Sequence, residues 1–264
     1  MNDQMSPNPA AITGTGQSDR PGDQDQRQLL DELYKKYGPE STTWGRFRNR
    51  LYYFHKKYAW LTVIHATLFL KRALDILVSV SMLILLAPLF LVTAIAIKLD
   101  SRGPVFYSQT RLGKWGRPFK MYKFRSMVVG ADKMKAELLS QNESGGVIFK
   151  MKRDPRITRV GRIIRKLSID ELPQLVNVLK GEMSLVGPRP ALPNEVEEYT
   201  FDDRRRLEVK PGLTGLWQIS GRSDLDFRQQ VRLDVAYIES QSFWQDIKIL
   251  FKTIPVVLLG KGAY

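Results

Sequence analysis

The chain has 264 residues, of which 41 are lysine or arginine and 27 are aspartate or glutamate, so its net charge at pH 7 is +14. An excess of this size indicates a polyanionic partner such as nucleic acid, anionic lipid or a phosphorylated substrate. The lack of cysteine excludes disulfides, thiol nucleophiles and cysteine zinc sites, and a count of only two histidines argues against a histidine-based triad or a multi-histidine metal site.

The N-terminal part of the chain divides into a polar tail and a basic, aromatic extension. Residues 1–26 are rich in Gly, Pro, Asp, Asn and Gln, a composition that predicts a disordered tail. The tail lacks the basic start and apolar middle of a signal peptide, so we expect a protein that is not secreted. Residues 27–70 are predicted to be a helical extension whose aromatic and cationic side chains favour the membrane–water interface. A helix packed on protein is the alternative.

Residues 76–97 are the most informative stretch, because they are apolar and uncharged over 22 residues. A bilayer core of ~30 Å needs ~20 helical residues, so we predict a membrane helix over residues 73–97. Lys71 and Arg72 flank one end, a second basic cluster follows the other, and positive residues prefer the cytoplasmic side. A re-entrant helix that bends at Pro88 keeps both clusters on one side, whereas a kinked but complete span would export one of them.

The region from residue 98 to residue 180 holds most of the excess positive charge, with 19 Lys+Arg against 7 Asp+Glu. Glycine and proline punctuation with short alternation predicts two strands or a hairpin over residues 103–127. The remaining elements follow from periodicity and from turn residues. They are a polar helix at 131–141, a mainly helical stretch at 157–179 with a break near Ser168, an extended loop at 187–193, a loop with one short strand at 211–222, and helices at 225–239 and 243–259, the last of which is a second candidate for the bilayer surface.

Asp170 and Glu171 are adjacent carboxylates in the most basic context of the chain. Their plain structural interpretation is a helix start, because Ser168-x-x-Glu171 matches a capping box and Asp170 favours the positive helix end. The surroundings favour chemistry instead, since Arg165 lies just upstream and the string KFR, residues 123–125, lies on a predicted strand. A carboxylate held ionised by arginines can attack phosphorus and form an acyl phosphate, while its neighbour holds a divalent cation against phosphate oxygens.

Long collinear strings extend this evidence over roughly three quarters of the chain, from Lys71 to the C-terminus. They are KRALDI, GPVFYSQTRLG, FKMYKFRSM, RITRVGRIIRKLSIDELPQLVNVLKGEMSLVGPRP, KPGLTGLWQISGR and DIKILFKT. In these strings the chain resembles the bacterial sugar transferases, that is, the monotopic polyprenyl-phosphate phosphoglycosyl transferases. The resemblance implies a helix-rich, membrane-associated α/β (α+β) fold with a re-entrant membrane helix, a small sheet and interfacial amphipathic helices, and it places the catalytic domain at residues 71–264.

The resemblance also implies a ping-pong reaction that moves a hexose 1-phosphate from a UDP-sugar to undecaprenyl phosphate and releases UMP. The family's nucleophile falls on Asp170, which would form a covalent phosphosugar–aspartate intermediate, and the glutamate that holds Mg²⁺ falls on Glu171. The membrane helix break falls on Pro88, although many members have serine where this chain has Ala87. The string GLWQISGRSDLDF favours UDP-galactose or UDP-glucose as the donor. The family's phosphate and substrate contacts fall on Lys123, Arg125, Arg165, Pro188, Arg189 and Arg222.

The same resemblance places the protein in the bacterial inner membrane, with the catalytic domain on the cytoplasmic face, at the first membrane step of exopolysaccharide or O-antigen synthesis. The implied partners are a UDP-sugar, undecaprenyl phosphate, membrane lipids and downstream glycosyl transferases, and a homodimer is left open. Nucleic acid is not expected as a partner, because the few aromatic residues between 98 and 180 occupy apolar strand positions instead of a stacking surface. A noncatalytic membrane scaffold of a glycan assembly complex is the alternative, and it would show no phosphosugar transfer at any magnesium concentration.

Overall fold

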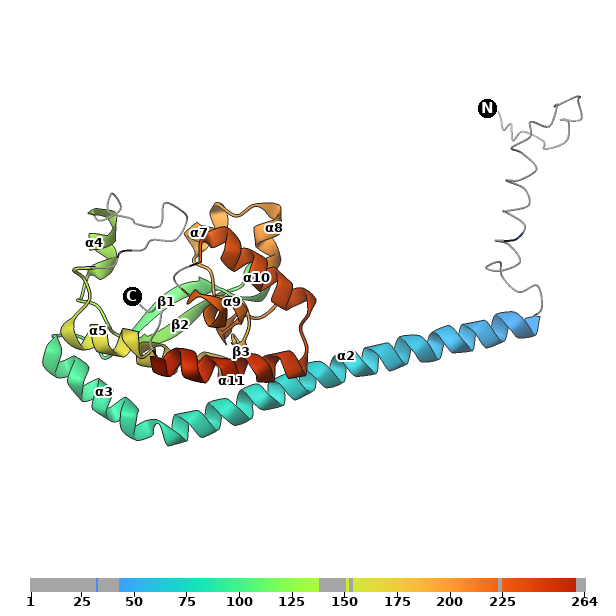
Figure 1. Cartoon of the computed structure of the whole chain (residues 1–264), viewed down its shortest axis with the longest axis horizontal. Coiled ribbons are helices and arrows are strands. Elements are labelled where there is room, and N and C mark those ends of the chain that lie inside the picture. The colour runs from blue at the N-terminus through green and yellow to red at the C-terminus, as the bar shows by residue number, and fades with distance from the viewer. Residues whose placement is uncertain (1–31, 33–42, 138–150, 152–153, 223–224, 260–264) are drawn as a thin grey trace, which may run out of the picture. The chain divides into compact units, whose positions relative to one another are not determined.

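The computed structural model describes residues 32, 43–137, 151, 154–222 and 225–259 of the chain (Figure 1). The tail predicted at residues 1–26 and the first part of the extension predicted at residues 27–70 lie outside these described residues. Contacts divide the chain into two units, Met1–Thr62 and Val63–Tyr264, which are described separately. The division falls within the predicted extension, ahead of the resemblance that begins at Lys71.

In the first unit, the described part consists of residue 32 and the start of a long helix, α2 (Thr43–Leu85). Large aromatic side chains are exposed along it, and the rings of Phe54 and Tyr58, one turn apart, have centroids 4.2 Å apart. Exposed rings on a basic helix are typical of a membrane–water interface. The segment is thus helical from residue 43 onward, and its contact with a bilayer stays a prediction.

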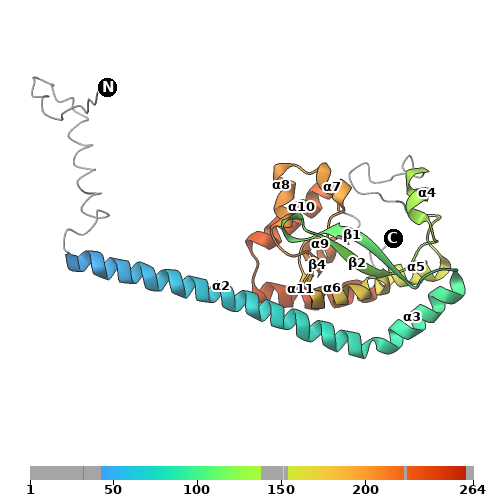
Figure 2. The same cartoon turned by 180° about the vertical axis from the view of Figure 1, so that it is seen from behind.

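In the second unit, α2 ends at Leu85 and α3 (Ala87–Asp100) begins after one residue (Figure 2). The bend between the two helices is 60°. Pro88 stands in the first turn of α3, where proline is tolerated because the N–H that it lacks would have no partner within the helix. The predicted helix break is therefore present. Among the described residues no single helix is long and apolar enough to cross a membrane, and only the bent pair passes that test, taken together.

The expected small sheet consists, within the described part of the chain, of two two-stranded pieces. The first is the predicted hairpin, in which β1 (Phe106–Leu112) runs antiparallel to β2 (Pro118–Phe124). Tyr107 stands opposite Lys123 in this register. Side chains that stand opposite on one face of a pair are close neighbours, so the hairpin brings an aromatic ring next to one of the predicted substrate contacts.

The second piece pairs β3 (Ser184–Val186) with β4 (Gly212–Thr214) in parallel. The backbones approach closely at Gly187 and Gly212, where a Cβ on Gly212 would overlap the backbone of Gly187. Only glycine permits this approach, which draws the loop after β3 against the loop before β4. The predicted extended loop at 187–193 starts at this point.

The helices of the second unit are short, apart from α2, α3, α10 and α11. The stretch predicted as helical at 157–179 forms α5 (Arg159–Lys166), η3 (Ile169–Gln174) and α6 (Leu175–Lys180), and it breaks at Ser168 as predicted. Helix α9, in a region predicted as loop and strand, was not foreseen, because its glycine-rich flanks hide a single helical turn. The remaining elements are η1 (Lys114–Gly116), α4 (Ala131–Glu137), α7 (Pro193–Glu197), α8 (Phe201–Arg204), η4 (Arg205–Leu207), α9 (Leu216–Ser220), α10 (Phe227–Glu239) and α11 (Phe243–Leu259).

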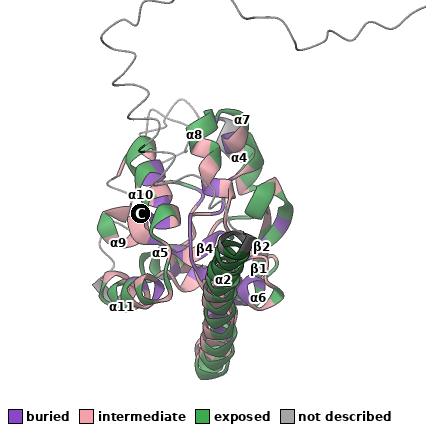
Figure 3. Cartoon of the chain, turned by 90° about the vertical axis from the view of Figure 1, so that its right-hand side faces the viewer, coloured by how far each residue is buried: buried purple, intermediate pink, exposed green. Residues whose placement is uncertain are grey.

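The hydrophobic core lies where β2, α6, β3, α10 and α11 meet, and Figure 3 shows the buried residues gathered around the strands. Val178 and Met183 are fully buried there. A smaller cluster of Ile97, Phe124 and Ile164 joins α3, β2 and α5. Both β2 and α5 contact η3, which carries the candidate carboxylates.

The second half of α2 is fastened to this core by a buried polar junction. The ammonium of Lys71 lies 2.5 Å from the carboxylate of Asp246 and donates to the carbonyl of Val186 at 3.0 Å. The hydroxyl of Tyr237 donates to the other oxygen of Asp246 at 2.7 Å. One lysine thereby links α2 to α10, α11 and the end of β3.

Two further residues of α2 complete the attachment. Arg72 donates to the carbonyls of Val178 and Leu179 at 2.6 and 2.7 Å, which satisfies the C-terminal end of α6. Asp75 accepts the backbone N–H of Leu185 at 2.9 Å. Lys71 and Arg72, which flank the predicted membrane helix, are therefore bound to other parts of the protein. The prediction of a re-entrant helix then depends on the bend at Pro88 and not on these two charges.

Candidate active site

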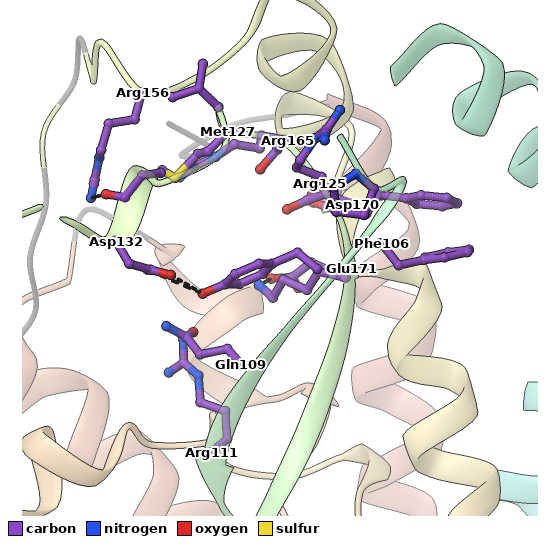
Figure 4. A pocket seen from close by; sticks show the side chains of 18 of the residues that line it. Phe106, Gln109, Arg111, Arg125, Met127, Asp132, Arg156, Arg165, Asp170 and Glu171 are labelled. Carbon is purple, nitrogen blue, oxygen red and sulfur yellow. Dashed lines mark hydrogen bonds and ion pairs between the residues drawn. The ribbon is translucent and has the colours of Figure 1, made fainter. Parts of the chain in front are cut away.

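A cavity of about 520 Å³ opens between the hairpin, η3 and the loops that follow β3 and α9 (Figure 4). Its volume suits a ligand of the size of a small nucleotide. Asp170 and Glu171 line it. Pro188 does not line it: this residue is buried, and its carbonyl accepts the N–H of Gly212 at 2.8 Å, which supports the loop. A contact of Pro188 with substrate stays a prediction. The other predicted contacts all line the cavity: Lys123, Arg125, Arg165, Arg189 and Arg222.

The two carboxylates are presented by η3, which begins after Ser168. Ser168 takes a left-handed conformation, with φ at 55°, and its side chain caps no backbone group of η3. The predicted capping box is therefore wrong, because a capping residue needs an extended backbone and because the Ser168 hydroxyl instead accepts from Arg222 at 2.9 Å. The left-handed turn releases Glu171 from a capping role, and its side chain binds Lys123 at 2.7 Å.

Asp170 is buried, with 8 % of its surface exposed. Burial raises the pKa of its carboxyl to about 6, with Lys123 opposing the rise and the neighbouring Glu171 adding to it. Arg165, beside Asp170 in Figure 4, also lowers this pKa. The carboxyl is thus mostly ionised at neutral pH and poorly solvated, which are the properties of an oxygen nucleophile that is ready to react.

Glu171 differs from its neighbour. Burial opposes its ionisation, but Lys123, Arg189 and Arg222 together outweigh burial, so its pKa lies below the usual range. Its side chain is 40 % exposed toward the cavity region. The pair therefore combines one carboxyl that titrates near pH 6 with one that stays anionic, a separation typical of two carboxylates with different tasks.

The loop that carries Arg189 is held from two sides. Arg189 lies 3.9 Å from the carboxylate of Glu195, and Arg111 of β1 donates to the carbonyl of Pro190 at 3.0 Å. Burial and the nearby Arg189 lower the pKa of Arg111 to about 10, so it stays charged at neutral pH. Arg111 lines the cavity and lies in the string GPVFYSQTRLG, but the sequence indicates no role for it beyond its positive charge.

Arg125 is a cavity residue whose guanidinium already has partners. It donates to the carbonyl of Ser101 at 2.7 Å and to that of Arg102 at 3.1 Å, which fastens the end of β2 to the end of α3. A Cβ at Gly103 would overlap this guanidinium, and Gly103 has a φ of 128° that only glycine adopts readily. We therefore assign Arg125 a positioning role beside its predicted contact with substrate.

The candidate ligands for the predicted Mg²⁺ are this pair of carboxylates. In the described part of the chain no group of three or more His, Cys, Asp and Glu side chains could hold a metal alone. Mg²⁺ at phosphate sites takes one or two carboxylates and completes its shell with phosphate oxygens and water. Glu171, part-exposed and anionic beside Asp170, fits that donor set.

The chain matches the family described as Bacterial sugar transferase over residues 66–260. It is 51 % identical over 202 residues to galactosyl transferase CpsE of Streptococcus agalactiae serotype III, covering 75 % of this chain and 44 % of that protein. It is 49 % identical over 200 residues to undecaprenyl-phosphate galactose phosphotransferase of Salmonella typhimurium, covering 74 % and 42 %. It is 44 % identical over 198 residues to exopolysaccharide production protein ExoY of Rhizobium meliloti, covering 74 % and 88 %. The chain thus spans less than half of the first two relatives and most of the third.

Proposed function

The chain belongs to the bacterial sugar transferase family, and we propose that it transfers a hexose 1-phosphate from a UDP-sugar to undecaprenyl phosphate with release of UMP. The observation that carries this proposal is the carboxylate pair Asp170–Glu171, with its separated pKa values, inside a cavity lined by cations. Two relatives are named for galactose transfer, which supports UDP-galactose as the first donor to test, followed by UDP-glucose.

In the first half-reaction, a carboxylate oxygen of Asp170 attacks the phosphorus that bears the sugar. A bond forms between this oxygen and phosphorus, the bond from phosphorus to the oxygen shared with the second phosphate breaks, and UMP leaves with the electron pair. Lys123, Arg165 and Arg189 supply positive charge to the phosphates and to the leaving group. Mg²⁺ held by Glu171 and phosphate oxygens would add further charge neutralisation.

In the second half-reaction, an oxygen of undecaprenyl phosphate attacks the phosphorus of the phosphosugar–aspartate. The bond between phosphorus and the Asp170 oxygen breaks, and Asp170 regains its carboxylate. Both nucleophiles are oxyanions, so the site needs cations more than it needs a general base. The lipid-linked product would then pass to downstream glycosyl transferases, as the first membrane step of exopolysaccharide or O-antigen synthesis.

Because the acceptor is a lipid, the site has to lie within reach of a bilayer. The bent pair of α2 and α3 supports a re-entrant seat in the bacterial inner membrane, with the second unit on the cytoplasmic face. Trp244, Phe251 and Ile254 of α11 are exposed. Lys248 and Lys252 are exposed in the same helix, and apolar and cationic side chains so combined are typical of a helix at the bilayer surface.

The test is UMP release by the detergent-purified full chain with Mg²⁺, across a panel of UDP-sugars and with or without undecaprenyl phosphate. We expect sustained release with one donor only when the lipid acceptor is present. Without the acceptor, we expect a burst of UMP and a phosphosugar adduct on Asp170 that mass spectrometry of a digest locates.

The noncatalytic scaffold makes the opposite prediction. It would give neither UMP nor an adduct with any donor at any magnesium concentration. An adduct on a carboxylate other than Asp170 would keep the reaction and overturn the assignment of the nucleophile.

A further inference from the structure

The cavity has a second end, away from the carboxylate pair. In Figure 4, Asp132 and Arg156 lie across the cavity from Asp170. The end is lined by Tyr107 of β1 and by the segment from residue 126 to the start of α4. The two half-reactions described above use none of these side chains.

Tyr107 connects the two ends of the cavity. It stands opposite Lys123 on the hairpin, and side chains in such a pair have Cβ atoms about 4.5–5.5 Å apart. Lys123 in turn binds Glu171 at 2.7 Å. A ligand whose phosphate lies at Lys123 therefore has Tyr107 as a close neighbour within the same cavity.

Asp132 adds a carboxylate to this end. The hydroxyl of Tyr107 lies 3.1 and 3.3 Å from the two carboxylate oxygens of Asp132 and donates to them. Burial, and to a lesser extent the negative charge of Asp132, raise the pKa of Tyr107 to about 12. The hydroxyl therefore keeps its proton at neutral pH and orients the carboxylate of Asp132. Asp132 is exposed, so its oxygens can accept further hydrogen bonds.

The wall that carries Asp132 is fixed by Arg156. The guanidinium of Arg156 binds the carboxylate of Asp154 at 2.6 Å and donates to the carbonyl of Ala131 at 3.3 Å. The N–H of Val128 donates to the carbonyl of Arg156 at 2.9 Å. The cation at this end is thus committed to the wall, and the exposed carboxylate of Asp132 disfavours a phosphate there.

We propose that Tyr107 and Asp132 form the nucleoside subsite, in which the ring of Tyr107 stacks on the base and the carboxylate of Asp132 accepts hydrogen bonds from ribose hydroxyls. This inference rests on the proposed function. Attack at the sugar-bearing phosphorus fixes that atom at Asp170, so the second phosphate and the nucleoside extend away from it. A neutral group with a flat ring and a pair of hydroxyls matches an aromatic face beside a carboxylate.

The first experiment measures the affinity of UMP for the purified full chain by isothermal titration calorimetry. Tyr107→Ala should weaken UMP binding about tenfold, since stacking of a base on an aromatic ring is worth about 1–3 kcal/mol. Tyr107→Phe keeps the ring and removes only the bond to Asp132, so it should stay within about threefold of the wild type. Tyr122→Phe is the matched control, because this tyrosine of β2 is not among the cavity-lining residues and its hydroxyl accepts from Lys180.

The second experiment compares UMP with 2′-deoxy-UMP in the wild type and in Asp132→Asn. We expect the wild type to prefer UMP about tenfold, because a hydrogen bond to a charged group is lost with the hydroxyl. Asp132→Asn should reduce this preference to about twofold. The comparison isolates the ribose contact from any effect of the substitution on the shape of the wall, which would weaken both nucleotides equally.

Three results would overturn the subsite. The first is an unchanged preference for UMP over 2′-deoxy-UMP in Asp132→Asn. The second is an equal loss of UMP affinity in Tyr107→Phe and Tyr107→Ala. The third is a Tyr107→Ala variant with unchanged UMP affinity but an altered choice between UDP-galactose and UDP-glucose, which would place the hexose at this end. The proposed function fails separately. A wild type that binds UMP through Tyr107 and Asp132 yet never releases UMP from a UDP-sugar would keep the subsite and remove the reaction.

Discussion

Two buried aspartates of the second unit, Asp246 and Asp170, have surroundings that are built in opposite ways. At the junction of α2 with α10 and α11, Asp246 has Lys71 at 2.5 Å and the hydroxyl of Tyr237 at 2.7 Å. In the cavity, Asp170 is subject to burial that its cations only partly offset, and its pKa rises to about 6. A carboxylate whose oxygens are both bound by partners serves rigidity, whereas one whose burial is only partly offset by nearby cations keeps its reactivity.

A third carboxylate shows that a raised pKa does not identify the site by itself. Burial raises the pKa of Asp234 to about 6, although Arg206 lies 2.7 Å away and opposes the rise. Asp234 does not line the cavity. What distinguishes Asp170 is the combination of a raised pKa, a cavity wall and the cation-bound carboxylate of Glu171 next to it.

The largest expected effect comes from Asp170→Asn. The amide cannot attack phosphorus, so turnover should fall by about 10⁴-fold or more, and the covalent adduct should vanish. Stability should hold or rise, because a pKa raised from 3.8 to about 6 means that ionised Asp170 costs the folded state about 3 kcal/mol at neutral pH. UMP release and thermal unfolding of the same preparation check both effects. Near-wild-type turnover would remove Asp170 from the chemistry.

Lys71→Met is the opposite experiment at the junction. It leaves the carboxylate of Asp246 buried without its cation, and such a loss typically costs about 3–5 kcal/mol of stability. We expect a clear fall in the unfolding temperature, measured by intrinsic fluorescence, with turnover per folded molecule kept within a few fold at low temperature. Lys248→Met, at an exposed position of α11, is the matched control and should change stability by less than about 0.5 kcal/mol.

The assignment of the junction to stability and of the cavity to the reaction would be wrong if Lys71→Met kept the stability of the wild type and lost its turnover. The junction would then act on the reaction, through the carbonyl of Val186 and the loop that leads to Arg189. A double variant that also replaces Asp246 with leucine should recover part of the stability, because two apolar groups no longer leave a charge uncompensated.

Glu171→Gln tests the second carboxylate. The amide keeps the shape but loses the charge that binds Lys123 and the proposed Mg²⁺, so we expect the rate to fall by about 10²–10³-fold. The rate should also lose its dependence on Mg²⁺ concentration, measured as initial UMP release. Glu197→Gln, at an exposed position of α7, should leave both unchanged. A Glu171→Gln variant with a normal Mg²⁺ titration would place the metal elsewhere.

The sequence predicts the parts of the fold that follow from local rules. Proline chemistry locates the break at Pro88, and punctuation by glycine and proline locates the hairpin. The helix-start pattern at Ser168 locates the break there, although the capping itself is not formed. The sequence misses α9, which is one helical turn between glycines, and it cannot foresee that the small sheet is divided into two pieces. Strand pairing across the chain depends on tertiary contacts that no local pattern records.

For the site, the sequence brings out the residues that lie in recognisable strings, and the structure gathers most of them in one cavity. It misreads Ser168 because the capping-box pattern contains no information on a left-handed backbone. It leaves out Tyr107 and Arg111, although both lie in the string GPVFYSQTRLG, because nothing in that string separates a cavity residue from an ordinary strand residue. It also leaves out Asp132, which lies outside the strings and resembles an ordinary surface position of a polar helix. Their significance comes from the register of β1 against β2 and from the packing of α4, which only three dimensions provide.

The smallest and most specific effect is the pH dependence of the first half-reaction. Because Asp170 must be ionised to attack, single-turnover UMP release should fall about tenfold per pH step of one below its pKa of about 6. The contribution of Asp170 to the free energy of unfolding has the opposite pH dependence to the rate. Because the folded state binds the proton of Asp170 more tightly than the unfolded state does, this contribution decreases as pH rises from about 4 to 6. Lys123→Met should move the midpoint of the rate above 6, because Lys123 lowers this pKa against the effect of burial. Two results would contradict this account: a midpoint of the pH–rate profile near 4 in the wild type, and a downward shift of that midpoint in Lys123→Met. Burial would then not raise the pKa of Asp170, and the contrast with the Lys71–Asp246 junction would no longer explain its reactivity.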